Sequence, residues 1–174
     1  MSPVNDLKIP SWDELFMRHA YLISSKSKDT RTKIGAVLIR DKRVISEGYN
    51  GIPIGVCDCK SERFERPEKY FWFEHAERNS VYACARYGIA SQGTIMYTQG
   101  VPCADCARAC IQAGIKEVVV HKQWQEYENK FNWEKWIDST KRSTAMLEEA
   151  GISVRVFDMT LGLQSMLDGK VVDV

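Results

Sequence analysis

Helical and strand patterns alternate through the second half of the chain. Segments with helical spacing of apolar residues lie at 75–88, 101–114 and 133–150. A short β-rich segment follows each of them, at 94–99, 117–122 and 153–158. Strands joined through a helix pair in parallel, because the helix carries the chain back to the edge of the sheet from which it started. The alternation therefore predicts an α/β fold with parallel strands at its centre.

The first half of the chain adds one helix and one hairpin. A helix is predicted over 11–27, where a serine N-cap is followed three positions later by glutamate. The β-rich segments 33–40 and 43–50 flank an Asp-Lys turn and predict a hairpin. Together these elements predict a three-layer α/β/α sandwich around one five-stranded mixed sheet.

Two further segments lack a clear pattern. Residues 51–73 are irregular, and a stretch of this length in a compact protein usually carries function. Residues 160–174 are predicted to form a short helix and a tail. There is no repeat or linker, and apolar residues make up 44% of the chain, which suffices for a core. We therefore expect residues 1–174 to form a single domain.

The net charge and the hydropathy of the chain argue against two kinds of partner, polymeric nucleic acid and a membrane. A net charge of +1 argues against polymeric nucleic acid, although a few local cations are enough to hold one phosphate. No run approaches 18 apolar residues, and the first residues lack the basic and apolar pattern of a signal peptide. We expect a cytoplasmic protein without a membrane partner. Its six cysteines are then expected to be reduced thiols or metal ligands rather than disulfides.

Two short motifs carry metal-binding chemistry. His75 opens one predicted helix, and Cys103 and Cys106 lie at the start of the next. Imidazole and thiolate are preferred zinc ligands, and three protein ligands leave the fourth tetrahedral position to water, as in catalytic sites. Glu77 lies in the first helical turn and can approach that water without binding the metal. The positive helix N-termini favour thiolate and carboxylate at these positions.

Neither motif is decisive alone, because a C-x-x-C pair also occurs in redox sites and in structural zinc sites. Together, with 24 residues between them (78–101), they form the H-x-E…P-C-x-x-C signature of zinc deaminases. Glu77 also argues against a non-catalytic zinc protein or a nucleotide sensor. A structural zinc site needs no carboxylate shuttle and usually has a fourth protein ligand.

The sequence resembles the deoxycytidylate (dCMP) deaminases of the cytidine deaminase superfamily. The similarity covers 12–55, 75–88 and 94–121, and GYNGIPIG at 48–55 distinguishes the deoxycytidylate branch. The resemblance implies hydrolysis of dCMP to dUMP and ammonia, which supplies dUMP for thymidylate synthesis. Zinc is expected to activate a water molecule. Glu77 is expected to pass its proton to the ring nitrogen and then to help protonate the departing ammonia.

The resemblance also implies substrate contacts. Asn50 corresponds to the asparagine that holds the sugar hydroxyl, although asparagine in Tyr-Asn-Gly is also a common turn residue. The backbone at Ala76 and Pro102 is expected to contact the amide edge of the base. Basic residues in relatives point to Arg31 and Lys33 as the phosphate ligands.

Four other residues leave two interpretations open. Arg108 is either a phosphate ligand or part of a solvated helix face, and Tyr127 either closes over the nucleotide or packs in the core. Cys57 and Cys59 are either ligands of a second, structural zinc or ordinary loop thiols. At the position of Arg78, many relatives carry a different residue. Arg78 is therefore expected to mark a subgroup with altered base or effector preference.

Regulation is implied by the resemblance as well. Members of the family are activated by dCTP and inhibited by dTTP, commonly with Mg²⁺. The matching effector positions are Gly48, Tyr49, Asn50 and Gly51. A homohexamer is also implied.

Other deaminases are alternatives, and they would act on a 5-substituted dCMP, on adenosine in transfer RNA or on the free nucleoside. The near-neutral charge argues against a large RNA. The helix between the last two predicted strands argues against the nucleoside enzymes, in which these strands are antiparallel. A 5-substituted dCMP stays open.

Overall fold

The computed structural model describes residues 9–131 and 134–174. The helices are α1 (Trp12–Ser24), α2 (Lys69–Trp72), α3 (Ala76–Tyr87), α4 (Ala104–Gln112), α5 (Lys122–Lys130) and α6 (Glu134–Glu149), with a 3-10 turn η1 (Ser61–Phe64). The strands are β1 (Gly35–Arg40), β2 (Arg43–Tyr49), β3 (Ile95–Thr98), β4 (Glu117–His121), β5 (Ser153–Phe157), β6 (Gln164–Leu167) and β7 (Lys170–Asp173).

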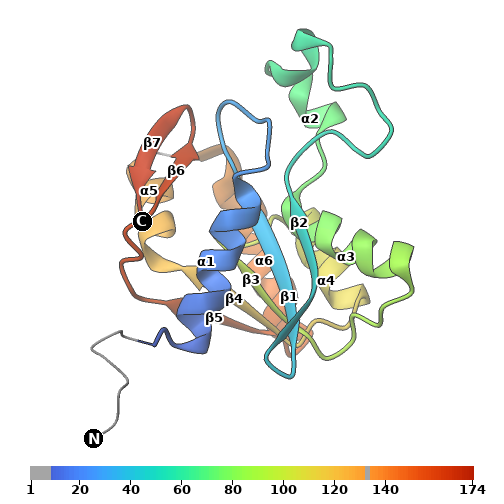
Figure 1. Ribbon diagram of the computed structural model, residues 1–174, viewed down its shortest axis with the longest axis vertical. Coiled ribbons are helices and arrows are strands. Elements are labelled where there is room, and N and C mark those ends of the chain that lie inside the picture. Colours follow the sequence, from blue (N-terminus) through green and yellow to red (C-terminus); the bar gives the residue numbers. More distant parts are fainter. Residues whose placement is uncertain (1–8, 132–133) are drawn as a thin grey trace, which may run out of the picture.

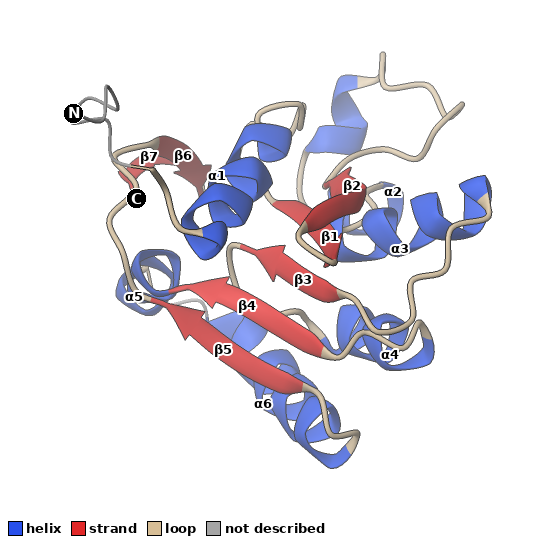
Figure 2. Cartoon of the chain, turned by 60° about the horizontal axis from the view of Figure 1, so that its bottom comes forward, coloured by secondary structure: helices blue, strands red, loops and turns tan. Residues whose placement is uncertain are grey.

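Five strands form one mixed sheet in the order β2-β1-β3-β4-β5, which Figure 2 shows edge to edge. Strand β1 is antiparallel to both β2 and β3. Strands β3, β4 and β5 are parallel, with Met96 opposite Val118 and Val118 opposite Val154. Helix α4 joins the first parallel pair, and α5 and α6 join the second. The predicted mixed sheet and its parallel strands are confirmed.

Helices cover both faces of this sheet (Figures 1 and 2). Alternate residues of β1 point to opposite faces, as a pleated strand requires. Val37 and Ile39 join a core cluster with α1, α5 and the β6–β7 hairpin. Ala36 and Leu38 join a second cluster with α3, α4 and α6. The two clusters give the three predicted layers, and the second one supports the helices that carry the metal motifs.

Local sequence explains where these elements begin and end. The Ser11 hydroxyl accepts a hydrogen bond from the Glu14 amide at 3.1 Å and caps α1. Helix α3 ends at Gly88, which has a left-handed φ of 67°. Asp41 and Lys42 both adopt positive φ in the β1–β2 turn, as predicted for a two-residue hairpin loop.

Two segments differ from the prediction. Residues 160–174 form the antiparallel β6–β7 hairpin instead of a short helix and a tail. Asp168 and Gly169 take positive φ at its turn, and Leu167 and Val172 are buried against the α1 side of the sheet. Helix α5 was not predicted, because its sequence is short and mostly polar. The expected helix start at Trp133 lies outside the described residues.

The irregular segment between β2 and α3 projects from one end of the molecule (Figure 1). It contains η1 and α2, and Gly51 pairs with Glu74 where the segment returns to α3. Within it, Cys57 and Cys59 form a disulfide, although both were expected to be reduced or metal-bound. The tight loop brings their Cα atoms to 5.4 Å, which is within disulfide range. None of the helices in the described part of the chain has both the length and the apolar character that a membrane span requires.

Candidate active site

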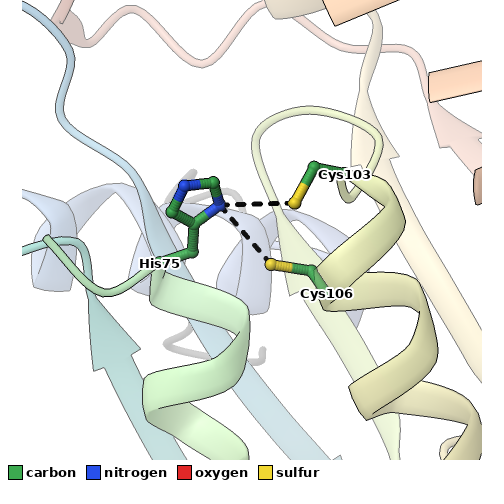
Figure 3. A group of neighbouring side chains, drawn as sticks. All are labelled: His75, Cys103 and Cys106. Atoms are coloured by element: carbon green, nitrogen blue, oxygen red, sulfur yellow. Dashed lines mark hydrogen bonds between the residues drawn. The ribbon is translucent and has the colours of Figure 1, made fainter. Parts of the chain in front are cut away.

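The two metal motifs meet where α3 and α4 begin (Figure 3). His75 is the N-cap of α3 and Cys103 is the N-cap of α4, so the ligands lie at two adjacent helix N-termini. The His75 Nδ1 atom lies 3.5 Å from the Cys103 Sγ and 3.5 Å from the Cys106 Sγ. All three ligand atoms lie within 4.8 Å of one another.

These separations fit a shared tetrahedral zinc ion. With Zn–S near 2.3 Å and Zn–N near 2.0 Å, tetrahedral geometry separates nitrogen from sulfur by about 3.5 Å. One imidazole and two thiols also form a donor set that zinc prefers. Among the described residues, only His75, Cys103 and Cys106 form such a group. Three ligands leave one position for water.

Without a metal, only Cys103 of the three residues is shifted towards its metal-binding form, and zinc would displace the protons of the other two. Hydrogen bonds from Cys106 and His75 lower the pKa of the Cys103 thiol to about 4, although burial acts in the opposite direction. The pKa of Cys106 is raised, because it donates to Cys103 and is buried. Burial lowers the pKa of His75, but its bond to Cys103 and the charge of Glu77 outweigh burial and raise it.

Glu77 lies in the first turn of α3 beside this cluster and is 6% exposed. Burial raises the pKa of its carboxyl group, the positive charge of His75 lowers it, and the thiolate of Cys103 raises it again. A carboxyl group with a raised pKa next to a metal-bound water can both take and return a proton. The position of Glu77 therefore suits proton transfer rather than metal binding.

The cluster opens into a pocket of about 620 Å³. Ala76 and Glu77 line it from α3, and Gly100, Val101 and Cys103 line it from the loop before α4. Pro102 is buried behind this loop and is not among the described lining residues, so Gly100 and Val101 take its predicted place. Helix α6 closes another side, and its Trp136 ring lies 6.0 Å from the His75 ring.

Asn50 lies in a buried polar corner of the pocket. Its Oδ1 atom accepts a hydrogen bond from the Ile34 amide at 2.8 Å, and its Nδ2 group donates to the Thr32 carbonyl at 2.8 Å and to Asp29 at 3.1 Å. Asp29 also accepts a hydrogen bond from Lys69, a buried ion pair of the segment before α3. Asn50 therefore has one lone pair of Oδ1 left for a ligand. Sequence reasoning missed Asp29 and Lys69, because their pairing spans the irregular segment.

The predicted phosphate ligands Arg31 and Lys33 do not line this pocket. The backbone carbonyl of Arg31 accepts from Gly169 at 2.7 Å, and the Lys33 amide donates to the Met166 carbonyl at 3.0 Å. The C-terminal hairpin, which was predicted as a helix, thus pairs with this segment. The described cations that do line the pocket are Arg66, Lys69 and Lys141.

Three other predicted residues also lie away from the pocket. Tyr127 packs against the core, with its ring 5.9 Å from that of Phe131. Arg108 is exposed on α4 and pairs with Asp105. Arg78 bonds Glu74 and lies 3.7 Å from Asp105, so it ties the start of α3 to the start of α4. These placements favour packing for Tyr127 and a solvated helix face for Arg108.

The four predicted effector residues span the end of β2: Gly48 and Tyr49 are its last two residues, and Asn50 and Gly51 follow it. Asn50 faces the pocket, and Tyr49 is half exposed. Gly48 packs directly on α3, since a Cβ there would lie 2.5 Å from the Ala76 carbonyl oxygen. Gly51 has only the Tyr49 ring near its missing Cβ. Gly48 therefore has a packing role whatever else it does.

Comparisons with known proteins agree with this site. Residues 10–122 match the family described as "Cytidine and deoxycytidylate deaminase zinc-binding region". The human deoxycytidylate deaminase is 32% identical over 154 residues, which cover 84% of this chain and 79% of that protein. An "Uncharacterized deaminase in luxG 3'region" of Aliivibrio fischeri is 33% identical and covers 84% of this chain and 93% of that protein.

Solved structures show the same fold. The dCMP deaminase of the cyanophage S-TIM5 superposes with a TM-score of 0.63 at 24% identity, over 86% of this chain and 100% of that one. The same phage enzyme in complex with dCMP and dUMP gives a TM-score of 0.61. The family match ends at residue 122, the first residue of α5, so the pocket residues of α5 and α6 lie beyond it.

Proposed function

Because this chain belongs to the cytidine and deoxycytidylate deaminase family and is a zinc-dependent deaminase, we propose that it hydrolyses dCMP to dUMP and ammonia. The observation that carries the proposal is the metal-binding group beside Glu77, which consists of His75, Cys103 and Cys106. Positively charged side chains line the same pocket. The metal group fits the hydrolytic chemistry, and the cations fit a phosphorylated substrate.

The metal ligands and Glu77 have different roles in the proposed reaction. His75, Cys103 and Cys106 would hold zinc, which when bound lowers the pKa of a water molecule towards about 7. Glu77 takes one proton of the attacking water and gives it to the ring nitrogen N3 of the base, while the water oxygen bonds to C4. Glu77 then takes the proton of the new hydroxyl group at C4 and passes it to the amine, so that the C4–N bond breaks, the C4 carbonyl forms and ammonia leaves. Burial raises the pKa of Glu77 and so favours the carboxyl form, which gives the proton back.

The pocket walls suit a pyrimidine deoxynucleotide. The backbone at Ala76, Gly100 and Val101 faces the edge of the base, while the rings of His75 and Trp136 border its faces. The remaining lone pair of Asn50 Oδ1 accepts a hydrogen bond from the sugar hydroxyl. These contacts follow the sequence-based roles of Asn50 and Ala76, and they move the role of Pro102 to its neighbours.

The phosphate lies with Arg66, Lys69 and Lys141 in this proposal. Lys69 is 8% exposed and is held by Asp29, whereas Arg66 and Lys141 are exposed at the solvent side of the pocket. Arg66 bonds Asp168 at 3.1 Å and can exchange this partner for a phosphate. The sequence-based assignment to Arg31 and Lys33 has no support from the pocket lining.

Regulation and assembly are further parts of the proposal. The resemblance supports a dCTP activator and a dTTP inhibitor at Gly48–Gly51, Mg²⁺ with the effector, a homohexamer and a role in dUMP supply for thymidylate. A single cytoplasmic domain stays a prediction. Assays with and without dCTP, dTTP and Mg²⁺, together with light scattering, test these points directly.

Steady-state assays of the zinc-loaded protein test the main proposal. We expect ammonia release from dCMP and much weaker release from deoxycytidine, which lacks the phosphate. Lys69→Ala should raise KM for dCMP about 10- to 100-fold, the usual effect of losing a charged hydrogen bond, whereas Lys33→Ala should not. Equal rates on nucleoside and nucleotide would refute the dCMP assignment.

A further inference from the structure

The start of helix α4, which carries Cys103 and Cys106, is not capped by its own N-cap residue. The first four amide groups of any helix have no partner within that helix. Cys103 occupies the N-cap position, where the side chain of serine, threonine, asparagine or aspartate usually accepts one of the missing hydrogen bonds. The Cys103 side chain makes no such bond, and its Sγ atom lies 3.5 Å from the His75 Nδ1 atom instead (Figure 3). The metal motif therefore occupies the position that would ordinarily fix this helix start.

A hydroxyl group on another helix partners the first amide of α4. The backbone amide of Ala104 donates a hydrogen bond to the Ser139 Oγ atom of α6 at 3.0 Å. Ala104 directly follows Cys103 and lies in the same helical turn as Cys106. Ser139 therefore holds the stretch of backbone that joins the two thiol ligands.

Helix α6 supports this turn from outside the substrate pocket. It packs along α4, where Leu147 of α6 and Cys110 of α4 belong to one buried cluster. Ser139 is not among the described residues that line the pocket, although Trp136 and Thr140 on the same helix are. An effect of the Ser139 hydroxyl on the reaction must therefore pass through the backbone of α4 and not through a contact with the substrate.

We propose that Ser139 is a positioning residue of the zinc site. From α6 its hydroxyl caps the first turn of α4 and holds Cys103 and Cys106 where one zinc ion can bind both. Helix ends fray when their amide groups lack partners, whereas zinc ligands must keep their distances to the metal within roughly 0.2 Å. The hydrogen bond to Ala104 meets this requirement at the one helix start whose N-cap side chain is a ligand itself and whose neighbour in space is α6.

The inference concerns the zinc-dependent chemistry of the family and not the choice of dCMP as the substrate. The family match at 10–122 includes the three ligands and Glu77, but it does not reach Ser139. The shared segment thus supplies the ligands, and a helix beyond it supplies the cap that orders two of them.

A second serine on α6 provides a matched control. Ser143 follows Ser139 by one helical turn and lies on the same side of the helix. It is fully buried, and within the described part of the chain its hydroxyl has no hydrogen-bond partner. Ser143→Ala therefore removes the same atom from the same helix face and leaves the cap of α4 intact. Because an unpaired buried hydroxyl is unfavourable, this variant should be no less stable than the wild-type protein.

The main measurement is the zinc dissociation constant, obtained by competition with a chromophoric chelator. We expect Ser139→Ala to raise it about 10- to 100-fold, the usual effect of removing a group that orients metal ligands. Ser139→Thr, which keeps the hydroxyl, and Ser143→Ala should both stay within about threefold of the wild-type value. The absorption spectrum of the Co²⁺-loaded protein reports the ligand geometry, and only Ser139→Ala should change it.

Two outcomes would overturn the proposal. If Ser139→Ala has the same zinc dissociation constant and cobalt spectrum as Ser143→Ala, the hydrogen bond to Ala104 does not position the ligands. If Ser139→Thr loses as much zinc affinity as Ser139→Ala, the hydroxyl group is not responsible. Measurements well below the Tm of each metal-free variant ensure that unfolding does not lower the apparent affinity. None of them uses a substrate, so they succeed or fail independently of the dCMP assignment.

Discussion

Gly48→Ala should destabilise the protein and disturb the metal site, although residue 48 is neither a zinc ligand nor a lining residue of the pocket. A Cβ at this position would lie 2.5 Å from the Ala76 carbonyl oxygen, 2.5 Å from the Ser80 amide nitrogen and 2.9 Å from the Asn79 carbonyl carbon. All three are backbone atoms of α3, so no side chain can rotate away. Strand β2 and helix α3 must separate by roughly 1 Å to restore ordinary contact.

The cost follows from this separation. Overpacking of a core usually costs about 1–3 kcal/mol. The shift also strains two hydrogen bonds between β2 and α3, from the Ser46 hydroxyl to the Ser80 carbonyl at 2.6 Å and from the Asn79 side chain to the Tyr49 carbonyl at 2.7 Å. A total of about 2–4 kcal/mol would lower Tm by about 5–12 °C in a protein of this size. Because α3 carries His75, a shift of this extent also exceeds the tolerance of roughly 0.2 Å for metal ligands.

Thermal unfolding, zinc content and kcat/KM measure these effects, with Gly51→Ala as the matched control. Gly51 belongs to the same predicted effector segment, has no positive φ, and a Cβ there would only meet the Tyr49 ring at 3.6 Å. We expect its Tm to stay within about 2 °C of the wild-type value. The packing argument is wrong if Gly48→Ala keeps the wild-type Tm and zinc content, or if Gly51→Ala loses as much stability.

Three further predictions concern the site and one buried histidine. Glu77→Gln should keep bound zinc and lose at least about 100- to 10,000-fold in kcat, because proton transfer fails; near-normal turnover of dCMP would contradict its role. After chelation of the metal, Cys103 should react with iodoacetamide at pH 6 faster than the other free thiols, because its pKa of about 4 makes it a thiolate at that pH. Bound zinc should protect it from this reaction. If mass spectrometry finds another thiol modified first, Cys103 is not the thiolate of the cluster. His121 is buried, bonds the Tyr21 hydroxyl and the Met159 carbonyl at 2.8 Å each, and has a lowered pKa because of burial. Its neutral form stabilises the fold above about pH 6.5, and this contribution is lost as the pH falls below that value; urea unfolding at pH 7.5 and 5.5 should show a smaller loss in His121→Asn than in the wild-type protein.

The parts that could be predicted are those in which local sequence decides the structure. The metal ligands lie within short motifs at helix N-termini, so their spacing alone brings them together once the two helices are adjacent. The alternation of helix and strand after residue 75 fixes the parallel pairing of β3, β4 and β5. Gly88 ends α3 as expected, because a left-handed residue is needed there.

The errors lie where tertiary contacts decide. The hairpin at 164–173 depends on an Asp-Gly turn and on burial against α1, and the prediction of a short helix and a tail took neither into account. The hairpin also pairs with the backbone of Arg31 and Lys33, the residues to which the resemblance assigned the phosphate, and neither residue lines the pocket. Lys69 could not be assigned from sequence, since only the folded chain shows that Asp29 holds it in the pocket.

The site has two parts with different origins in the chain. Atoms that act on the reacting bond come from the starts of α3 and α4, within the family match at 10–122. Several groups that line the pocket come from outside it, from α5 with Glu128 and from α6 with Trp136 and Lys141. Proton transfer and metal binding at C4 depend on the starts of α3 and α4, whereas α5 and α6 border the space left for the rest of a ligand. Substitutions of the pocket-lining residues in α5 and α6 should therefore change the affinity for the substrate before they change the chemistry at C4.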